Sequence, residues 1–201
     1  MRINTLRLRA IIGWLGMLLP WIVVVLIKAF PQSISATWYT NACTPFMIIL
    51  GSASMLLICY KGYTKFDDII LTCAGVAGLC ICLFPCGATT LKEVGTFMLE
   101  RRTSSIIHNA SAIIFFVLLS YNSFFLFTKS SGKKTRKKRI RNAIYRISGL
   151  GMIASFALLL LPPFYIQLWL VETIALFFFG ISFLTKADIY PWLFCDTPYT
   201  D

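Results

Sequence analysis

The fold follows from the last long apolar stretch of the chain, which reads Ile166-Gln-Leu-Trp-Leu-Val-Glu172-Thr-Ile-Ala-Leu-Phe-Phe-Phe-Gly180. Its length and apolar character are typical of a helix that crosses a membrane. Glu172 is the single charged residue in it. A charged side chain at the centre of a membrane helix costs about 2.5–3.5 kcal/mol on insertion scales, so such residues usually face a bundle interior and have a partner or a function. We therefore expect Glu172 to face other helices rather than lipid.

The composition of the 201 residues is not that of a soluble globular protein. Hydrophobic residues make up 58% and charged residues 13%, whereas soluble domains carry roughly 45–50% apolar and about 25% charged residues. Six segments have the apolar character and approximate length of membrane helices, and we place them at residues 11–30, 45–60, 69–85, 105–127, 144–164 and 166–184. They leave no room for a separate soluble domain. We therefore predict an all-α membrane protein, with residues 1–201 forming a single six-transmembrane-helix bundle.

The net charge of +11 reflects a one-sided distribution of basic residues rather than a nucleic-acid-binding surface. If the chain crosses the membrane six times, 15 of the 19 lysines and arginines fall on one side. The four exceptions are Lys28, Lys92, Arg101 and Arg102. Basic residues in short loops mark the cytoplasmic side, so we expect both termini to be cytoplasmic, in a multi-pass protein of a bacterial inner membrane. We predict a basic cytoplasmic loop at residues 128–142, in which Lys129–Arg141 could also contact anionic membrane lipids.

The first segment has a second interpretation. Arg2, Arg7 and Arg9 precede an apolar run, as in a secretory signal, and Ser33-Ile-Ser35 is a weak match to a cleavage site. However, the apolar run is longer than the roughly 7–15 residues usual for a signal. We therefore expect a retained membrane helix.

His108 is the only histidine, and it lies about one turn below the external end of the fourth segment. With Ser111 and Asn122 it falls on roughly one face of a helix, as the helical period of 3.6 residues dictates. Glu172 lies about two turns below the external surface, near 9 Å at about 1.5 Å per residue. Because the two depths are comparable, we predict a Glu172–His108 pair, direct or through water, with Lys28 as a competing partner.

These side chains define a predicted ligand site on the external side, between the first, fourth and sixth segments. Its members are His108, Glu172, Ser35, Tyr39 and Asn122. A structural hydrogen bond is the alternative interpretation of His108. A metal site is poorly supported, because a catalytic zinc ion usually has three protein ligands and the chain has one histidine. The sequence also lacks a phosphate-binding glycine loop, and we predict neither a metal nor a cofactor.

Several smaller predictions concern helix ends and helix contacts. Cys43 and Cys86 are expected at the external ends of the second and third segments, where a disulfide is possible in an oxidising compartment. Asp67 and Asp68 are expected at the start of the third segment, where carboxylates stabilise a helix. The longest external connection carries a candidate short helix through Leu91–Leu99. Small residues that predict close helix packing are Gly75, Gly78, Cys82 and Cys86, and Ser148, Gly151 and Ser155.

Three stretches together resemble a known family. They are Pro31-Gln-Ser33-Ile-Ser35, then Ile107-His108-Asn-Ala-Ser-Ala112-Ile-Ile-Phe-Phe116, and Glu172 followed by Phe179-Gly-Ile-Ser-Phe183-Leu-Thr-Lys-Ala-Asp188. The pattern is similar to the six-helix family that contains the damage-regulated autophagy modulators, the Sfk proteins and the GPI-anchor lipid-remodelling proteins, and to bacterial six-helix membrane proteins of unknown function. The chain departs from it at Thr44-Pro45-Phe46, where eukaryotic members place an acidic residue. The resemblance implies a lipid-linked or regulatory role without established catalytic chemistry.

The leading hypothesis is an integral membrane protein, not assigned to a reaction, that binds a lipid headgroup or a small polar ligand. The enzyme alternative is a lipid-modifying hydrolase or acyltransferase with His108 as base, Glu172 orienting it and Ser111 as the candidate nucleophile. In a third hypothesis, a proton-coupled transporter, Glu172 carries the proton. An apolar cleft open to the bilayer would favour lipid binding, and a continuous water path would favour transport. A carboxylate bonded only to backbone or to serine and threonine would indicate a structural role.

Overall fold

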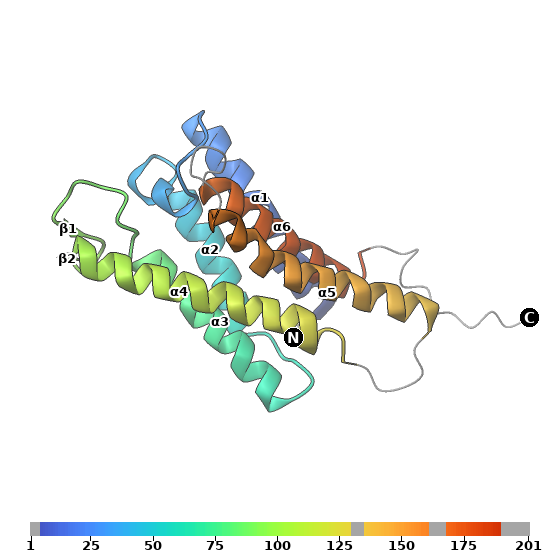
Figure 1. Cartoon of the computed structure of the whole chain (residues 1–201). Helices are drawn as coiled ribbons and strands as arrows, with labels where there is room; N and C mark the ends of the chain where they lie inside the picture. Colours follow the sequence, from blue (N-terminus) through green and yellow to red (C-terminus); the bar gives the residue numbers. More distant parts are fainter. Residues whose placement is uncertain (1–4, 130–134, 161–167, 190–201) are drawn as a thin grey trace, which may run out of the picture.

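The structure, a computed structural model, describes residues 5–129, 135–160 and 168–189. Figure 1 shows the six α-helices of these ranges. They are α1 (Thr5–Ile27), α2 (Cys43–Ile58), α3 (Lys65–Leu83), α4 (Arg101–Tyr121), α5 (Arg136–Ala157) and α6 (Leu168–Lys186). The 3-10 helices η1 (Ser35–Tyr39) and η3 (Leu158–Leu160), the π-helical turn η2 (Asn122–Leu126) and one short hairpin complete the described fold. The predicted all-helical architecture is confirmed.

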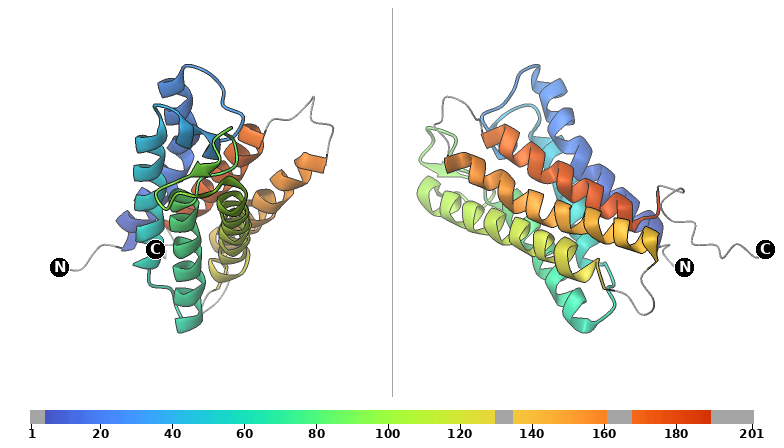
Figure 2. Two further views of the ribbon diagram at one scale, coloured as in Figure 1. Left: turned by 90° about the vertical axis from the view of Figure 1, so that its left-hand side faces the viewer. Right: turned by 45° about the vertical axis from the view of Figure 1, so that its right-hand side comes forward.

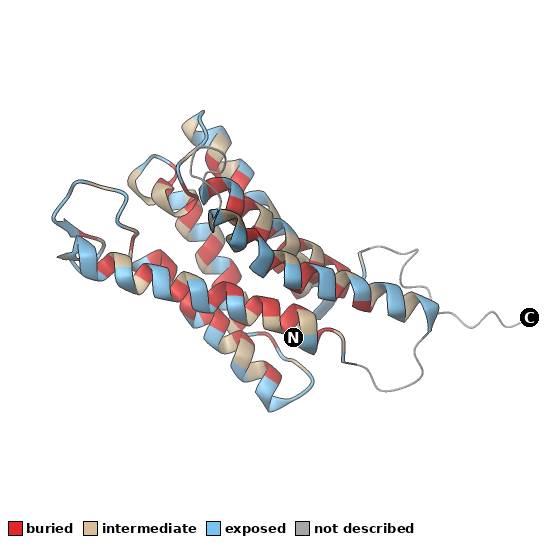
Figure 3. Ribbon diagram, viewed as in Figure 1, coloured by how far each residue is buried: buried red, intermediate tan, exposed pale blue. Residues whose placement is uncertain are grey.

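The helices form a closed ring in sequence order. Each packs against its sequence neighbours, and α6 packs back against α1. The right-hand view of Figure 2 shows α4, α5, α6 and α1 following one another across the bundle. Buried positions lie along the inward faces of the helices, and exposed positions face outwards (Figure 3). Inward-facing side chains of almost every helix therefore meet at the centre of the ring.

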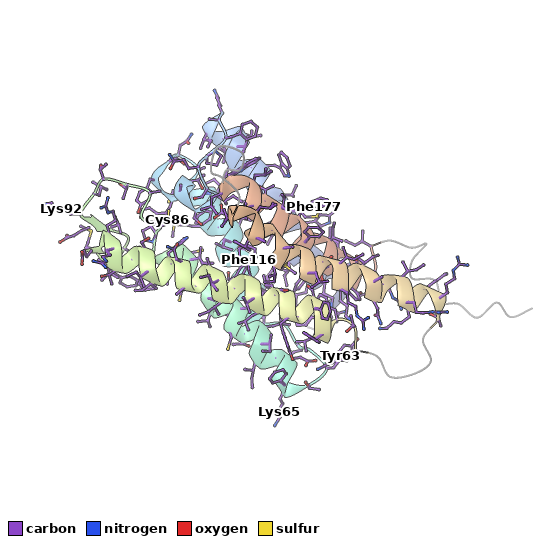
Figure 4. The ribbon with its side chains drawn as sticks, in the orientation of Figure 1. Tyr63, Lys65, Cys86, Lys92, Phe116 and Phe177 are labelled. Carbon is purple, nitrogen blue, oxygen red and sulfur yellow. The ribbon has the colours of Figure 1, made fainter. Side chains whose placement is uncertain are left out.

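Successive helices run in opposite directions, so the bundle has two distinct ends. We call one the basic end, because Arg9, Lys65, Lys129 and Lys186 lie there. The other is the hairpin end, which carries the antiparallel strands β1 (Glu93–Val94) and β2 (Leu99–Glu100). In Figure 4, Lys92 marks the hairpin end, and Tyr63 and Lys65 lie at the opposite end. The segregation of basic residues inferred from the sequence is therefore present in the fold.

Within the described residues, four helices are long and apolar enough to cross a membrane. They are α1, α3, α6, and α4 together with η2 over residues 101–126. Helix α2 is apolar but has 16 residues. Helix α5 begins with a basic stretch, and the expected span over 144–164 ends on residues outside the described ranges. The fold therefore supports an integral membrane protein with four membrane-length helices within the described residues, and the six spans stay a prediction.

The start of α5 corrects the prediction of a basic loop over residues 128–142. The helix begins at Arg136, and the Thr135 hydroxyl accepts a hydrogen bond of 3.2 Å from the Lys138 amide as an N-cap. Lysine and arginine have high helix propensity, and a threonine cap satisfies one of the free amides of the first turn. The second half of the basic stretch is consequently helical and extends α5 beyond its apolar part.

Two other helix-end predictions have different outcomes. Asp67 and Asp68 do lie in the first turn of α3, although the cap itself is Thr64. Their carboxylates accept hydrogen bonds from the preceding backbone, including 2.6 Å from Gly62 N to Asp68 Oδ1. The short helix expected at Leu91–Leu99 is wrong, because the strands β1 and β2 occupy this segment. Its turn contains Gly95 with a φ of +77°, a conformation that glycine adopts without steric cost.

Small residues permit close helix contacts, as predicted for Gly75 and as the structure adds for Gly180. A Cβ atom at Gly75 of α3 would lie 2.5 Å from the carbonyl oxygen of Ser54 in α2. A Cβ at Gly180 of α6 would lie 2.9 Å from the carbonyl oxygen of Gly13 in α1. Small side chains let helix backbones approach in lipid, where no hydrophobic force drives helices together. These two contacts join α3 to α2 and α6 to α1 within the ring.

Candidate functional site

Glu172 binds the loop that follows α1. Its Oε2 accepts a hydrogen bond of 2.5 Å from the backbone amide of Ile34, and the Ser35 side chain is a second hydrogen-bonding partner. One turn earlier in α6, the Trp169 amide donates to the carbonyl oxygen of Gln32 at 3.0 Å. The segment 32–35 is therefore attached to the first turns of α6 by both backbone and side chain.

The local sequence explains why the Ile34 amide is available to Glu172. The Ser33 hydroxyl accepts from the Ala36 amide at 2.9 Å, and the Thr37 hydroxyl donates to the Ile34 carbonyl at 2.6 Å. These serine and threonine bonds form a tight turn that opens η1. The Ile34 amide donates to Glu172, and a carboxylate is a strong acceptor for such a backbone amide.

A cavity of about 40 Å³ lies inside the ring next to Glu172. Nine of its lining residues are apolar, and the two polar ones are Glu172 and Ser35. The apolar members come from the interior of the bundle and from the loop: Leu19, Ile34, Phe46, Leu50, Ile81, Ala112, Phe115, Phe116 and Leu176. Figure 4 shows Phe116, a residue of α4, in the middle of the bundle. Residues of α1, α4 and α6 line this cavity, but so do residues of α2 and α3.

His108 contacts the end of α3 and not the loop that holds Glu172. Its Nδ1 lies 2.7 Å from the carbonyl oxygen of Phe84, and the side chain is buried. Because a carbonyl can only accept, Nδ1 carries the proton. Ser104 of α4 donates to the next carbonyl, Pro85, at 2.8 Å. His108 and Glu172 thus have separate hydrogen-bond partners, and His108 does not line the cavity.

Tyr39 also binds the segment after α3. Its hydroxyl donates to the Cys86 carbonyl at 2.6 Å, so the carbonyls of residues 84, 85 and 86 each receive a side-chain hydrogen bond. Buried or membrane-embedded backbone groups need such partners. Burial, followed by the nearby Cys86 thiol, raises the pKa of Tyr39 to about 12. Tyr39 therefore joins η1 to the segment that follows α3, and it does not line the cavity.

The other predicted site residues lie elsewhere. Asn122 is buried at the start of η2, 14 residues after His108, which corresponds to about 21 Å along a helix. Ser111 is buried one turn beyond His108. Lys28 is exposed at the residue that follows α1. The structure therefore brings together Glu172 and Ser35, and it places Asn122 toward the basic end.

Cys43 and Cys86, between which a disulfide is possible from the sequence, are free thiols in the structure. The Cys43 sulfur lies 3.8 Å from the Met47 sulfur within α2. Burial raises the pKa of the Cys86 thiol, which favours its neutral and unreactive form. Within the described residues, no group of three or more histidine, cysteine, aspartate or glutamate side chains has the arrangement of a metal site.

The hydrogen bonds of Glu172 are of the kind expected for a structural carboxylate, because they involve a backbone amide and a serine. The adjoining apolar cavity is the feature that a purely structural role leaves unexplained. Sequence reasoning identified Glu172 and Ser35 but not the cavity's aromatic wall, because phenylalanines are frequent throughout the chain. His108, the base of the enzyme hypothesis, has a different hydrogen-bond partner, the Phe84 carbonyl oxygen.

Four membrane-length helices and an inward-facing polar site define the class of the protein, a helical integral membrane protein. The chain matches no protein-family model, no curated protein and no solved structure. The two stretches that carry the family resemblance in the first loop and in α6 do meet in space, through Ile34 and Glu172. Membership of the six-helix family stays a prediction.

Proposed function

We propose that this integral membrane protein binds a membrane lipid in the central cavity, with a hydroxyl or amino group of the lipid against Glu172 and Ser35. The observation that carries the proposal is the pairing of an apolar cavity inside the helix ring with a single carboxylate at its wall. Ligand sites in helix bundles are built in this way, from apolar walls and a few polar groups that fix orientation. A carboxylate is an acceptor, so the matching ligand group is a donor.

The size of the cavity supports recognition of one small group rather than of a whole headgroup. A buried water needs roughly 10–15 Å³ of such space, so about 40 Å³ holds a few waters or one hydroxyl or amine with its first carbon atoms. The remainder of the ligand would lie between the helices that line the cavity. A lipid whose headgroup lacks a donor would lose the hydrogen bond and gain little from the site.

The proposed orientation places the cavity in the external half of the bundle. Glu172 lies one turn into α6 from the hairpin end, and the basic residues lie at the other end. The positive-inside rule assigns the basic end to the cytoplasm. The cavity would then lie at the depth of the outer leaflet.

Lipid mass spectrometry on detergent-purified protein tests the proposal. We would compare the bound lipids of the wild type with those of Glu172→Gln and Ala112→Leu. The first variant removes the charge, and the second fills the cavity without touching the carboxylate, because Ala112 lies on its α4 wall. In both variants, the amount of the same bound lipid should fall at least about tenfold, which corresponds to a loss of about 1.4 kcal/mol of binding free energy.

A matched control is Ala110→Leu, which adds the same atoms at an exposed position of α4. It should retain the wild-type lipids. If Ala112→Leu retains them as well, the cavity is not the binding site. If in addition Glu172→Gln only lowers the thermal stability, then Glu172 is a structural anchor for the segment 32–35.

A further inference from the structure

A second polar centre lies at the basic end, far from the cavity, around Lys186 in the last turn of α6. The Lys186 side chain is buried, with 7% of the residue exposed. Its Nζ donates to the Phe127 carbonyl at 3.2 Å and to the Tyr63 hydroxyl at 3.4 Å. Aromatic rings of three residues surround it, with centroids 5.1–5.6 Å from Nζ. These rings belong to Tyr63, Phe127 and Tyr145.

Arg9 of α1 joins the same centre. Its Nε donates to the Tyr60 hydroxyl at 2.8 Å, and its Nη1 donates to the Lys186 carbonyl at 3.2 Å. The guanidinium also lies 5.4 Å from the centroid of the Tyr60 ring. Two cations from neighbouring helices therefore converge on one partly buried site.

Among the described residues, no carboxylate forms an ion pair with either of the two cations at this centre. The two ion pairs among the described residues are Lys129–Asp67 and Lys61–Asp68, and neither includes Lys186 or Arg9. Arg9, Lys138 and Arg141 all act on Lys186 as like charges, and Asp188 is the opposing acidic neighbour. Neutral acceptors and aromatic faces offset only part of the cost of burying a cation. An anion would complete the site.

We propose that Arg9 and Lys186 form a binding site for a phosphate group at the membrane surface of the basic end. An arginine fork and an ammonium group are the usual protein donors to phosphate oxygens. The Tyr60 and Tyr63 hydroxyls accept from the cations and keep their own protons to donate. Lys186 is the last residue of a membrane-length helix, so the site lies at the depth of the lipid headgroups.

This site differs from a general attraction of the basic stretch Lys129–Arg141 to anionic lipid. Its two central cations belong to α1 and α6 and are fixed by hydrogen bonds to tyrosines and backbone, whereas an attraction to surface charge needs no fixed geometry. A phospholipid headgroup and free phosphate share the chemistry that the site recognises. The experiment therefore has an arm for each source.

Thermal unfolding of the purified full chain in detergent provides the test. Added phosphatidylglycerol should raise the midpoint by about 4 °C or more over an added neutral glycolipid, which has no phosphate group, because a ligand stabilises the state that binds it. Lys186→Gln should abolish this difference. Arg9→Lys keeps the charge but loses the planar fork, and it should abolish most of the difference. Lys65→Gln is the matched control, because it removes an exposed cation at the same end; it should behave as the wild type.

Inorganic phosphate, compared with chloride at equal ionic strength, identifies the source of the phosphate group. If it reproduces the shift, the ligand is free phosphate. If it has no effect while phosphatidylglycerol does, the ligand is the lipid headgroup. Equal shifts with both lipids in the wild type would overturn the proposal. The proposal would also be overturned if Lys65→Gln lost as much of the midpoint difference as Arg9→Lys does, because that result would indicate surface charge alone. If Lys186→Gln does not fold, Arg9→Lys decides the result.

Discussion

At the scale of single residues, polar side chains of α4, α6 and η1 bind backbone groups at the helix ends and in the connecting segments. Glu172 accepts from the Ile34 amide, His108 donates to the Phe84 carbonyl, and Tyr39 donates to the Cys86 carbonyl. Irregular backbone near a membrane is tolerated only where such partners satisfy it. The sequence singled out Glu172 and His108, but their partners are backbone atoms, which no residue pattern reveals.

His108 should be replaceable by asparagine but not by alanine. In His108→Ala the Phe84 carbonyl loses its donor and stays buried, which should lower the free energy of unfolding by about 1–3 kcal/mol. The amide nitrogen of asparagine can take the place of Nδ1, so His108→Asn should recover most of that loss. Thermal unfolding in detergent measures both variants. Equal stabilities for alanine and asparagine would show that the hydrogen bond contributes nothing.

Tyr39 should make the protein sensitive to alkaline pH. Its pKa is raised to about 12 in the folded protein, against 10.0 for the free side chain, chiefly by burial. Below pH 10 both states are protonated, so the stability contributed by the neutral hydroxyl is fully present; it is lost as the pH rises from 10 to 12. Other tyrosines titrate in the same range. The test is therefore the difference between the wild type and Tyr39→Phe, whose melting temperature should fall less steeply across that interval.

At the scale of the helices, glycines decide how closely neighbours pack, and charged ends decide where helices begin. Gly75 brings α3 against the Ser54 carbonyl of α2. Helix α5 begins at Arg136 and not at the apolar boundary, because Thr135 caps it and its basic residues are compatible with a helix in water. Hydropathy locates the apolar part of a helix but does not locate the polar turn that extends it.

Two glycine variants should separate a close helix contact from glycine's low helix propensity. Gly75→Ala places a Cβ against backbone and should destabilise the protein by about 1–3 kcal/mol. Gly51→Ala is the control, because nothing lies within 4 Å of a Cβ there. It should be neutral or stabilising by up to about 1 kcal/mol, since alanine favours helix more than glycine does. Chemical or thermal unfolding of both variants gives the comparison, and equal effects would contradict it.

At the scale of the whole molecule, the ring of six helices separates two polar regions. The Glu172 cavity lies toward the hairpin end, and the Arg9–Lys186 site lies at the basic end. The two regions share no residues, so binding at one can be removed without altering the other. This separation makes the two lipid proposals independently testable.

The proposed orientation can be tested with single cysteines in a background without the seven native ones. Lys92→Cys lies on the exposed hairpin end and Lys65→Cys on the exposed basic end. A membrane-impermeant maleimide added to intact cells should label the first variant and should label the second only after lysis, because basic residues mark the cytoplasmic side. Labelling of both variants in intact cells, or of the second alone, would contradict the assigned topology.

The sequence by itself determined the membrane class, the helical architecture, the segregation of basic residues and the exceptional position of Glu172. Each of these depends on local composition and period, which a linear chain displays directly. Only the tertiary structure decided that Glu172 meets Ile34 and not His108, and that the cavity has an aromatic wall. Only the tertiary structure showed that Arg9 and Lys186, 177 residues apart, are joined by a hydrogen bond. The physical reason is that these contacts depend on helix rotation and on loop backbone, which are set by packing across the whole ring.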